Sequence, residues 1–340
     1  FLGKSNGEDV TVELFHMLIA GQTNLSGKTT TILSLMPEAI KQGYTIIAFD
    51  TKPTVRELTG FRDIPICYRA TTDPLVLIGL LEGIFRRRLS PYYATLGRLT
   101  ERASSIDDVI RNAQVMEDKA KSGFIKDACY SLRDLLQRLR RELEGLDLTE
   151  SLTLIPNTVN VMPINKLSTE AQQLVIKTAF EQLLKHFNTK TIAIIDESWR
   201  FLPEGYSSAC KRAIQDVITQ GAKTKLFVWL ATQFLAPTEK DALKGMPIKI
   251  LGRQDHDTEI THTLDLIPGG KSKFKSQDIM TLKRGEFIYV PIEGEVKKVY
   301  VTPPWEREQV LTPVIEPVDE WTEEELKKAH RKLDELEARM

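Results

Sequence analysis

The chain contains few cysteines, with Cys67, Cys129 and Cys210 the three among 340 residues. They lie far apart, so they have neither the paired spacing of a zinc site nor the even number typical of a secreted disulfide framework. Long apolar runs are also missing, since none approaches the about 18 residues of a membrane span. The opening FLGKSNGEDV lacks the basic-then-apolar pattern of a signal peptide. We therefore expect a cytoplasmic protein with no transmembrane segment.

The chain also has no large excess of positive or negative residues, since its formal net charge is -1. The chain is not a bulk polycation, so binding to nucleic acid would need a local basic surface. Hydrophobic residues make up 41% and charged residues 27% of the chain. This composition is typical of a globular protein, and the length allows two or three substructures at roughly 100–200 residues per domain.

Apolar runs that end at turns or acidic residues predict the strands of a buried parallel sheet. FHMLIA (15–20) and YTIIAFD (44–50) flank a helical segment, TTTILSLMPEAIKQG, and together they predict a βαβ unit. Later strands are expected at LTLIP, TVNVMPI, TIAIIDE (191–197), KLFVWLATQ (225–233) and PIKILGR (247–253), with helices at about 168–187 and 207–220. The sequence therefore predicts an α/β fold with a mainly parallel sheet.

Four regions are expected along the chain: a first core part (1–70), an all-helical insertion (71–150), a second core part (151–304) and a C-terminal extension (305–340). The second core part ends in a predicted hairpin around Glu293-Gly294. In the extension, a helix is expected from Asp319, with a heptad-like apolar stripe. That helix either packs on its own domain or docks on a neighbouring subunit or partner.

Residues 21–30, GQTNLSGKTT, differ by one residue from a phosphate-binding P-loop, because five residues rather than four separate Gly21 from Gly27. In a P-loop, backbone N–H groups at a helix N-terminus wrap the phosphates, a Lys reaches the β/γ-phosphates and a Ser/Thr hydroxyl holds Mg²⁺. The segment follows a predicted strand and precedes a predicted helix, so we interpret it as a working but enlarged loop. The residues expected to bind the nucleotide are Gly21, Gln22, Thr23, Ser26, Gly27, Lys28, Thr29 and Thr30.

The strand TIAIIDE ends in Asp196-Glu197, which fits a Walker B element. There the Asp holds Mg²⁺ and the adjacent Glu orients or deprotonates the attacking water. Strands often end in acids at solvent, but a P-loop earlier in the same α/β pattern favours the catalytic interpretation. Asp196 and Thr29 are thus the expected metal ligands.

The segments HMLIAGQT…GKTT, YTIIAFDTKPT, TIAIIDESWRFLP and LFVWLATQ, in this order, resemble the HerA–FtsK superfamily of P-loop motors. That group contains HerA helicases, conjugative coupling proteins, type IV secretion ATPases and viral genome-packaging ATPases. The similarity covers about 1–70 and 150–302 and is specific to the superfamily, not to one member. It implies a RecA-like P-loop core, with the helical insertion where many relatives carry an all-α domain.

The resemblance also implies a homo-oligomer, a hexameric ring that hydrolyses ATP with Mg²⁺ at its subunit interfaces and pulls double-stranded DNA or other cargo through its pore. By matching motifs, Lys28 and Thr29 would bind phosphate and Mg²⁺, and Asp196 and Glu197 would be the Walker B pair. Gln233 of LATQ would be the γ-phosphate sensor. HerA relatives work with a NurA-type nuclease, which makes a nuclease one expected partner; a conjugation or secretion apparatus is the other.

One departure concerns the arginine finger. Relatives often have Gly-Arg-Lys before the sensor strand, with the Arg reaching the ATP of the adjacent subunit, whereas this chain reads Gly221-Ala222-Lys223. Lys223 keeps a positive charge, and Arg253 offers a guanidinium from elsewhere. The sequence does not rank these two candidates. Because such a finger contributes on the order of 10³–10⁵ in rate, slow or differently triggered hydrolysis is one consequence.

Candidate DNA contacts are Lys271, Lys273 and Lys275 in PGGKSKFKSQ (268–277), which is predicted to be a flexible loop. Lysines there suit phosphates without reading bases, although surface lysines are common. The arginines at 86–88 and at 138, 140 and 141 are expected on solvated helix faces. Asp50 either shapes the nucleotide site or only ends its strand, and His256 is expected in a solvated loop rather than a metal cluster.

Three functions remain open at this point. The leading hypothesis is an ATP-driven, ring-forming translocase of double-stranded DNA. The second is a conjugation or type IV secretion motor whose cargo is protein or nucleoprotein. The third is an ATP-binding assembly scaffold with little turnover, suggested by the altered loop and the missing finger.

Overall fold

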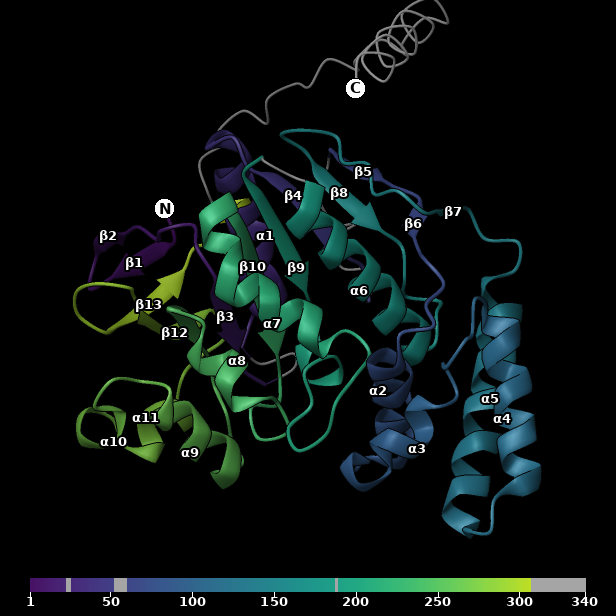
Figure 1. Cartoon of the computed structure of the whole chain (residues 1–340). Helices are drawn as coiled ribbons and strands as arrows, with labels where there is room; N and C mark the ends of the chain where they lie inside the picture. Colours follow the sequence, from purple (N-terminus) through teal and green to yellow (C-terminus); the bar gives the residue numbers. More distant parts are fainter. Residues whose placement is uncertain (23–25, 52–59, 187–188, 307–340) are drawn as a thin grey trace, which may run out of the picture. The chain divides into compact units, whose positions relative to one another are not determined.

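The computed structural model describes residues 1–22, 26–51, 60–186 and 189–306 (Figure 1). The chain divides into two compact units, Phe1–Pro304 and Trp305–Met340. The predicted C-terminal helix, with its apolar stripe, lies outside the described residues, as does Thr23 of the P-loop. Among the described residues, no helix combines the length and apolarity needed to cross a bilayer.

The first unit is built on a large twisted sheet. Its strands are β1 (Gly3–Ser5), β2 (Glu8–Val10), β3 (Met17–Ala20), β4 (Thr45–Phe49), β5 (Phe61–Asp63), β8 (Val159–Met162), β9 (Thr191–Ile195), β10 (Leu226–Thr232), β11 (Ile248–Leu251), β12 (Glu286–Val290) and β13 (Lys297–Val301). Across the described part of the sheet the order is β2-β1-β13-β12-β11-β3-β10-β9-β4-β8-β5. The pairs from β11 to β5 are parallel, and those from β11 through β12, β13 and β1 to β2 are antiparallel. A separate parallel pair joins β6 (Ile66–Cys67) to β7 (Leu148–Thr149).

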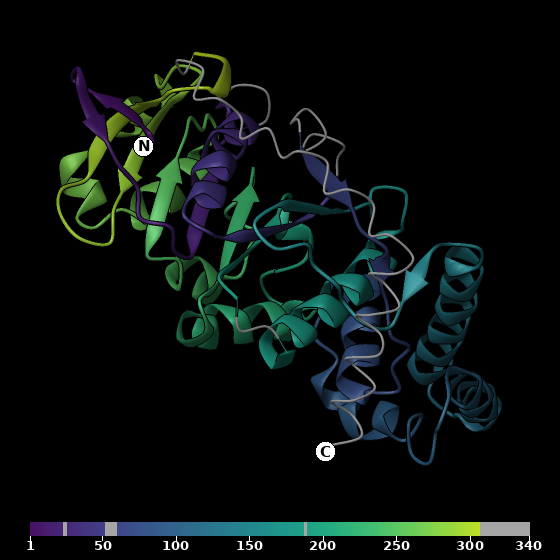
Figure 2. The same cartoon turned by 90° about the horizontal axis from the view of Figure 1, so that it is seen from above.

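Helices cover both faces of the parallel strands, as Figure 2 shows. The helices of the described residues are α1 (Lys28–Lys41), α2 (Pro74–Phe85), α3 (Tyr93–Gly97), α4 (Ile106–Lys119), α5 (Gly123–Leu143), α6 (Thr169–His186), α7 (Lys211–Gln220), α8 (Lys240–Lys244), α9 (Asp257–Asp265), α10 (Gly270–Lys273) and α11 (Ser276–Met280). Side chains alternate along each strand, so Met17 and Ile19 of β3 pack on the α1 side while Leu18 and Ala20 pack on the α6 and α7 side. Burial on both faces explains why these strands read as continuous apolar runs. The fold is therefore the α/β, mainly parallel one that the sequence predicts.

Helices α2 to α5 occupy the place of the predicted helical insertion, and α4 and α5 lie side by side there (Figure 1). Leu132, Leu136, Leu139 and Leu143 recur at helical spacing along α5 and are buried. The polar residues between them face outward, which is the amphipathic pattern of a helix packed on one side. The insertion is thus an ordered part of the first unit.

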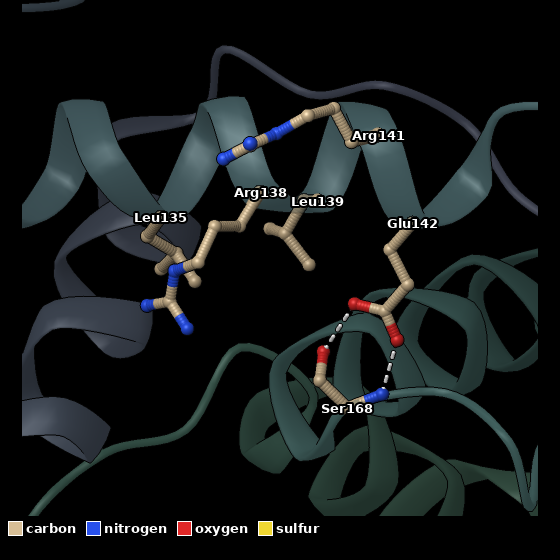
Figure 3. Close-up of a pocket in the computed structure, with 6 residues that line it drawn as sticks. All are labelled: Leu135, Arg138, Leu139, Arg141, Glu142 and Ser168. Carbon is tan, nitrogen blue, oxygen red and sulfur yellow. Dashed lines mark hydrogen bonds between the residues drawn. The ribbon is translucent and has the colours of Figure 1, made fainter.

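Two carboxylates tie this insertion to the core. Glu142 of α5 accepts hydrogen bonds from the backbone N–H and the hydroxyl of Ser168, just before α6, with the Oγ–Oε2 distance at 2.7 Å (Figure 3). Arg138 and Arg141 line an open pocket of about 500 Å³ beside this contact. Glu82 of α2 is 1% exposed and accepts from Leu89 N, Tyr93 Oη and Ser207 N. A buried carboxylate needs such donors, so both contacts fix the insertion against the core.

The structure corrects two predictions of secondary structure. LTLIP does not form a strand, because its backbone bonds to side chains: Leu152 N donates to Gln182 and Ile155 N donates to Asn160. The segment 268–277 is not a loop but contains α10 and the start of α11. His256 is exposed and directly precedes α9 as its N-cap residue, and α9 is a helix that the sequence did not predict.

His16, directly before β3, is expected to make the fold sensitive to acid. Its ring is 1% exposed, its Nδ1 accepts from Val228 N at 3.1 Å, and burial lowers its pKa from 6.5 to about 4. The unfolded chain therefore binds a proton at His16 that the folded chain does not, between pH 6.5 and 4. Folding stability from this residue is complete above pH 6.5, and about 2–3 kcal/mol of it is lost by pH 4.5.

Urea unfolding at pH 7 and pH 4.5 measures this effect when wild type is compared with His16→Asn. The amide oxygen of Asn keeps an acceptor near Val228 N but does not titrate. Carboxylates that titrate in the same range are present in both proteins, so only the difference between the two pH dependences reports His16. Equal losses of stability in the two proteins would contradict the prediction.

Candidate active site

The P-loop connects β3 to α1 and is anchored on the two strands that flank β3. Gly21 N donates to Thr232 O at the end of β10 at 3.2 Å, and Gln22 N donates to Arg253 O beyond β11 at 2.9 Å. These bonds continue the ladder of the parallel sheet past the last residue of β3. The first part of the loop is therefore held in a fixed place at the carboxyl edge of the sheet.

Two glycines let the loop close tightly. Gly27 is the N-cap residue of α1 and has φ 88°, a left-handed conformation that costs a residue with a side chain. At Gly21, an added Cβ would lie 2.7 Å from both Cβ and Oγ of Ser26. Ser26 itself is fully buried and donates from its Oγ to Gln22 O at 2.9 Å. The glycines at the two ends of the motif are thus required by the geometry of the loop.

Lys28 is the first residue of α1, and its side chain turns back into the loop. Only 8% of Lys28 is exposed, and Nζ donates to Gly21 O at 2.7 Å. Thr29 and Thr30 follow in the first turn of α1 and are half-buried. The N–H groups at the start of this 14-residue helix point toward the loop, and together with the Lys28 ammonium they favour an anion there.

The acidic pair follows β9. Asp196 Oδ1 accepts from Glu197 N at 2.8 Å, and Glu197 is 4% exposed. Glu197 has φ 52°, a left-handed conformation that a residue with a side chain adopts only when its surroundings enforce it. Asp50, at the end of the neighbouring strand β4, is 1% exposed. Two carboxylates are thus buried at or beside this edge, where a cation would be favourable.

Strand order brings these groups together. β10 pairs with β3 on one side and with β9 on the other, all three parallel, so their carboxyl ends lie at the same edge. With about 4.8 Å between neighbouring strands, the P-loop and the acidic pair begin about 10 Å apart. Gln233 follows β10 and so lies between them, where its backbone O accepts from Gln254 Nε2 at 3.3 Å.

The residues at this edge fit ATP with Mg²⁺. Gln22 Oε1, Ser198 Oγ and Arg253 Nε are buried there without a hydrogen-bond partner within the described residues. Buried polar atoms rarely lack partners in folded proteins, and a polar ligand satisfies them. Thr29 supplies a hydroxyl and Asp196 a carboxylate, which are the hard oxygen ligands that Mg²⁺ takes.

The two candidates for the arginine finger, Arg253 and Lys223, lie at opposite ends of the parallel strands. Arg253 is half-buried and its backbone O accepts from Gln22 N, so it lies beside the P-loop of its own chain. Lys223 is exposed in the 3₁₀ helix η4 (Gly221–Thr224), which precedes β10. The seven residues of β10 rise about 23 Å, at about 3.3 Å each, between Lys223 and the P-loop edge. Lys223 therefore cannot reach the site of its own chain.

The predicted DNA contacts lie on the segment between β11 and β12. Lys271 and Lys273 belong to α10 and Lys275 precedes α11, and all three are exposed. Lys271 forms an ion pair with Asp265 at 2.6 Å. Of the predicted solvated arginines, Arg138 is half or more exposed and pairs with Asp134.

Sequence reasoning missed two aromatic residues beside the acidic pair. Trp199 Nε1 donates to Glu197 Oε2 at 2.7 Å, and the Trp199 ring packs edge-to-face on Phe234, with 5.6 Å between the centroids. Each residue closely follows a predicted catalytic residue in the chain. A tryptophan two residues after the acidic pair was the available signal.

No family model matches the chain, and no curated protein does. Among solved structures it is similar to VirB4 of Thermoanaerobacter pseudethanolicus, with 16% identity, a TM-score of 0.62, and 90% of this chain and 97% of that chain covered. It is also similar to the bacterial conjugative coupling protein TrwBΔN70, with 12% identity, a TM-score of 0.52, and coverage of 84% and 85%. At these identities the likeness is one of fold. The chain thus shares the fold of VirB4 and TrwBΔN70.

Proposed function

We propose that the chain is an ATP-hydrolysing motor subunit that moves double-stranded DNA. The observation that carries this proposal is the meeting of a P-loop lysine, an Asp-Glu pair and a polar strand-end residue at one edge of the sheet. Binding of a nucleotide alone would need only the first of these. A glutamate buried beside the metal ligand adds the group that takes a proton from water.

Each residue has one role in this proposal. Bound ATP with Mg²⁺ supplies the phosphoanhydride bond and a divalent charge on the phosphates. Lys28 binds the phosphates, and Thr29 and Asp196 hold the metal. Glu197 accepts the proton of the attacking water, and Gln233 contacts the terminal phosphate. The buried setting strengthens these electrostatic contacts, because they compete less with water.

A ring of subunits is part of the proposal because Lys223, at the amino end of β10, cannot reach the nucleotide site of its own chain. It can act on a bound nucleotide only in the site of a neighbouring subunit. Lys223 is exposed at the amino edge of β10, so a second copy of the chain can receive it. We assign Lys223 to the neighbouring site and Arg253 to its own. The hexamer remains a proposal from the superfamily resemblance.

The proposed cargo is double-stranded DNA, contacted through phosphates by Lys271, Lys273 and Lys275. A second candidate is a conjugation or secretion motor that moves protein or nucleoprotein. It is favoured by the likeness to VirB4 over nearly the whole length of both chains and by the likeness to a conjugative coupling protein. The expected partner is then the conjugation apparatus; for a DNA translocase it is a NurA-like nuclease.

Steady-state ATP hydrolysis with and without long duplex DNA tests the proposal. We expect several-fold stimulation by DNA at 50 mM salt that is lost at about 200 mM, since phosphate contacts weaken steeply with salt. A variant with Lys271, Lys273 and Lys275 changed to Ala keeps its basal rate and loses stimulation. Hydrolysis that ignores DNA but rises with a conjugation partner supports the second candidate. Absence of hydrolysis under all conditions contradicts both.

A further inference from the structure

The indole of Trp199 contacts the carboxylate that the proposed function makes the general base. Its Nε1 donates to Glu197 Oε2 at 2.7 Å, at the short end of the N–H···O range. Because Glu197 is only 4% exposed, protein donors rather than water set the direction of its carboxylate. The indole N–H is such a donor, and it belongs to a rigid side chain.

The backbone conformation around Glu197 allows the hydrogen bond between Trp199 and Glu197 to form. The left-handed conformation of Glu197 ends β9 and starts the 3₁₀ helix η3 (Ser198–Arg200), where Arg200 N donates to Glu197 O at 2.9 Å. This tight turn brings the side chain of residue 199 back over residue 197. A strained conformation persists only where the surrounding structure enforces it, and such conformations cluster at functional sites.

The other side of the indole rests on the turn that carries Gln233. Phe234 packs edge-to-face on Trp199, at an interplanar angle of 82°. That turn is itself fixed, because Thr232 Oγ1 accepts from Phe234 N and donates to Phe234 O, at 3.2 and 2.9 Å. Trp199 therefore touches both the acidic pair and the residue next to the proposed phosphate sensor.

We propose that Trp199 is a positioning residue for hydrolysis. Its indole N–H holds the Glu197 carboxylate in the direction needed to take a proton from water, and its ring fixes that carboxylate relative to the Gln233 turn. This inference rests on the proposed ATPase function. A purely structural tryptophan would contribute packing to the core without affecting the rate of the bound nucleotide's hydrolysis.

Trp199→Phe separates these roles, because it keeps an aromatic ring next to Phe234 but has no N–H donor. We expect kcat for ATP to fall about 10–100-fold, the cost of a misplaced catalytic group, with KM and the affinity for a non-hydrolysable ATP analogue unchanged. Trp305→Phe is the matched control, since Trp305 is 69% exposed. A Trp199→Phe enzyme with wild-type kcat overturns the inference, whether or not its KM for ATP rises.

A second measurement does not need turnover. The chain has four tryptophans, so ¹⁵N-labelled tryptophan gives four indole N–H signals, of which Trp199→Phe removes one. Glu197→Gln is expected to shift that proton signal upfield, because a neutral amide oxygen is a weaker acceptor than a carboxylate. The exposed Glu293→Gln leaves it in place. A Trp199 signal that Glu197→Gln does not move overturns the inference. A wild type that hydrolyses no ATP contradicts the proposed function instead.

Discussion

Glu197→Gln is expected to lower ATP hydrolysis by about 10²–10⁴-fold, the usual contribution of a general base. The substitution keeps the shape of the side chain, and an amide oxygen can still accept from Trp199 Nε1. What it removes is the ability to take a proton from water. Nucleotide binding by Lys28 and the loop does not depend on that ability, so ATP should still bind.

Steady-state hydrolysis and calorimetric titration with a non-hydrolysable ATP analogue check the two halves of this prediction separately. Glu293→Gln, in the exposed hairpin turn, is the control for the same chemical change elsewhere. Hydrolysis at the wild-type rate in Glu197→Gln would rule out Glu197 as the base. Loss of binding together with loss of rate would instead make Glu197 part of the nucleotide pocket's structure.

The long buried strands could be predicted because their signal is local. β3, β4, β9 and β10 lie between helices on both faces, so nearly every side chain is apolar and the run is visible in the sequence. The edge strand β2 and its neighbour β1 were missed because each has three residues, partly exposed, with no apolar run. The strand predicted at LTLIP was wrong for the opposite reason. The segment is an apolar run, but its backbone N–H groups bond to side chains of α6 and β8 instead of to a neighbouring strand.

The types of residue in the site could also be predicted, but not their arrangement. The P-loop and the Asp-Glu pair are motifs of neighbouring residues, whereas the position of β10 between β3 and β9 is a property of the sheet. The contact of Trp199 with Phe234 joins residues 35 positions apart, and no spacing rule signals it. The same strand order underlies our proposed assignment of Lys223 to the neighbouring site and of Arg253 to its own, which the sequence could not rank.

The proposed assignment of Lys223 and Arg253 leads to the last prediction. It states which subunit supplies each positive charge to a nucleotide site. Lys223→Ala is expected to slow hydrolysis by up to about 10³-fold, the lower end of the effect of an arginine finger, because lysine lacks the bidentate fork. Arg253→Ala is expected to act within its own subunit. Both single variants lose rate, so single substitutions do not distinguish the two positions.

Mixing variants does distinguish them. In rings that combine Lys223→Ala with Glu197→Gln subunits, a Lys223→Ala subunit keeps its own Glu197 and receives Lys223 from a Glu197→Gln neighbour, so some sites are complete. In rings that combine Arg253→Ala with Glu197→Gln, every site belongs to a subunit that lacks one of its own residues. Hydrolysis should therefore recover in the first mixture and not in the second. Recovery in neither mixture would refute the assignment of Lys223 to the neighbouring site, because each chain would then depend on its own residues alone.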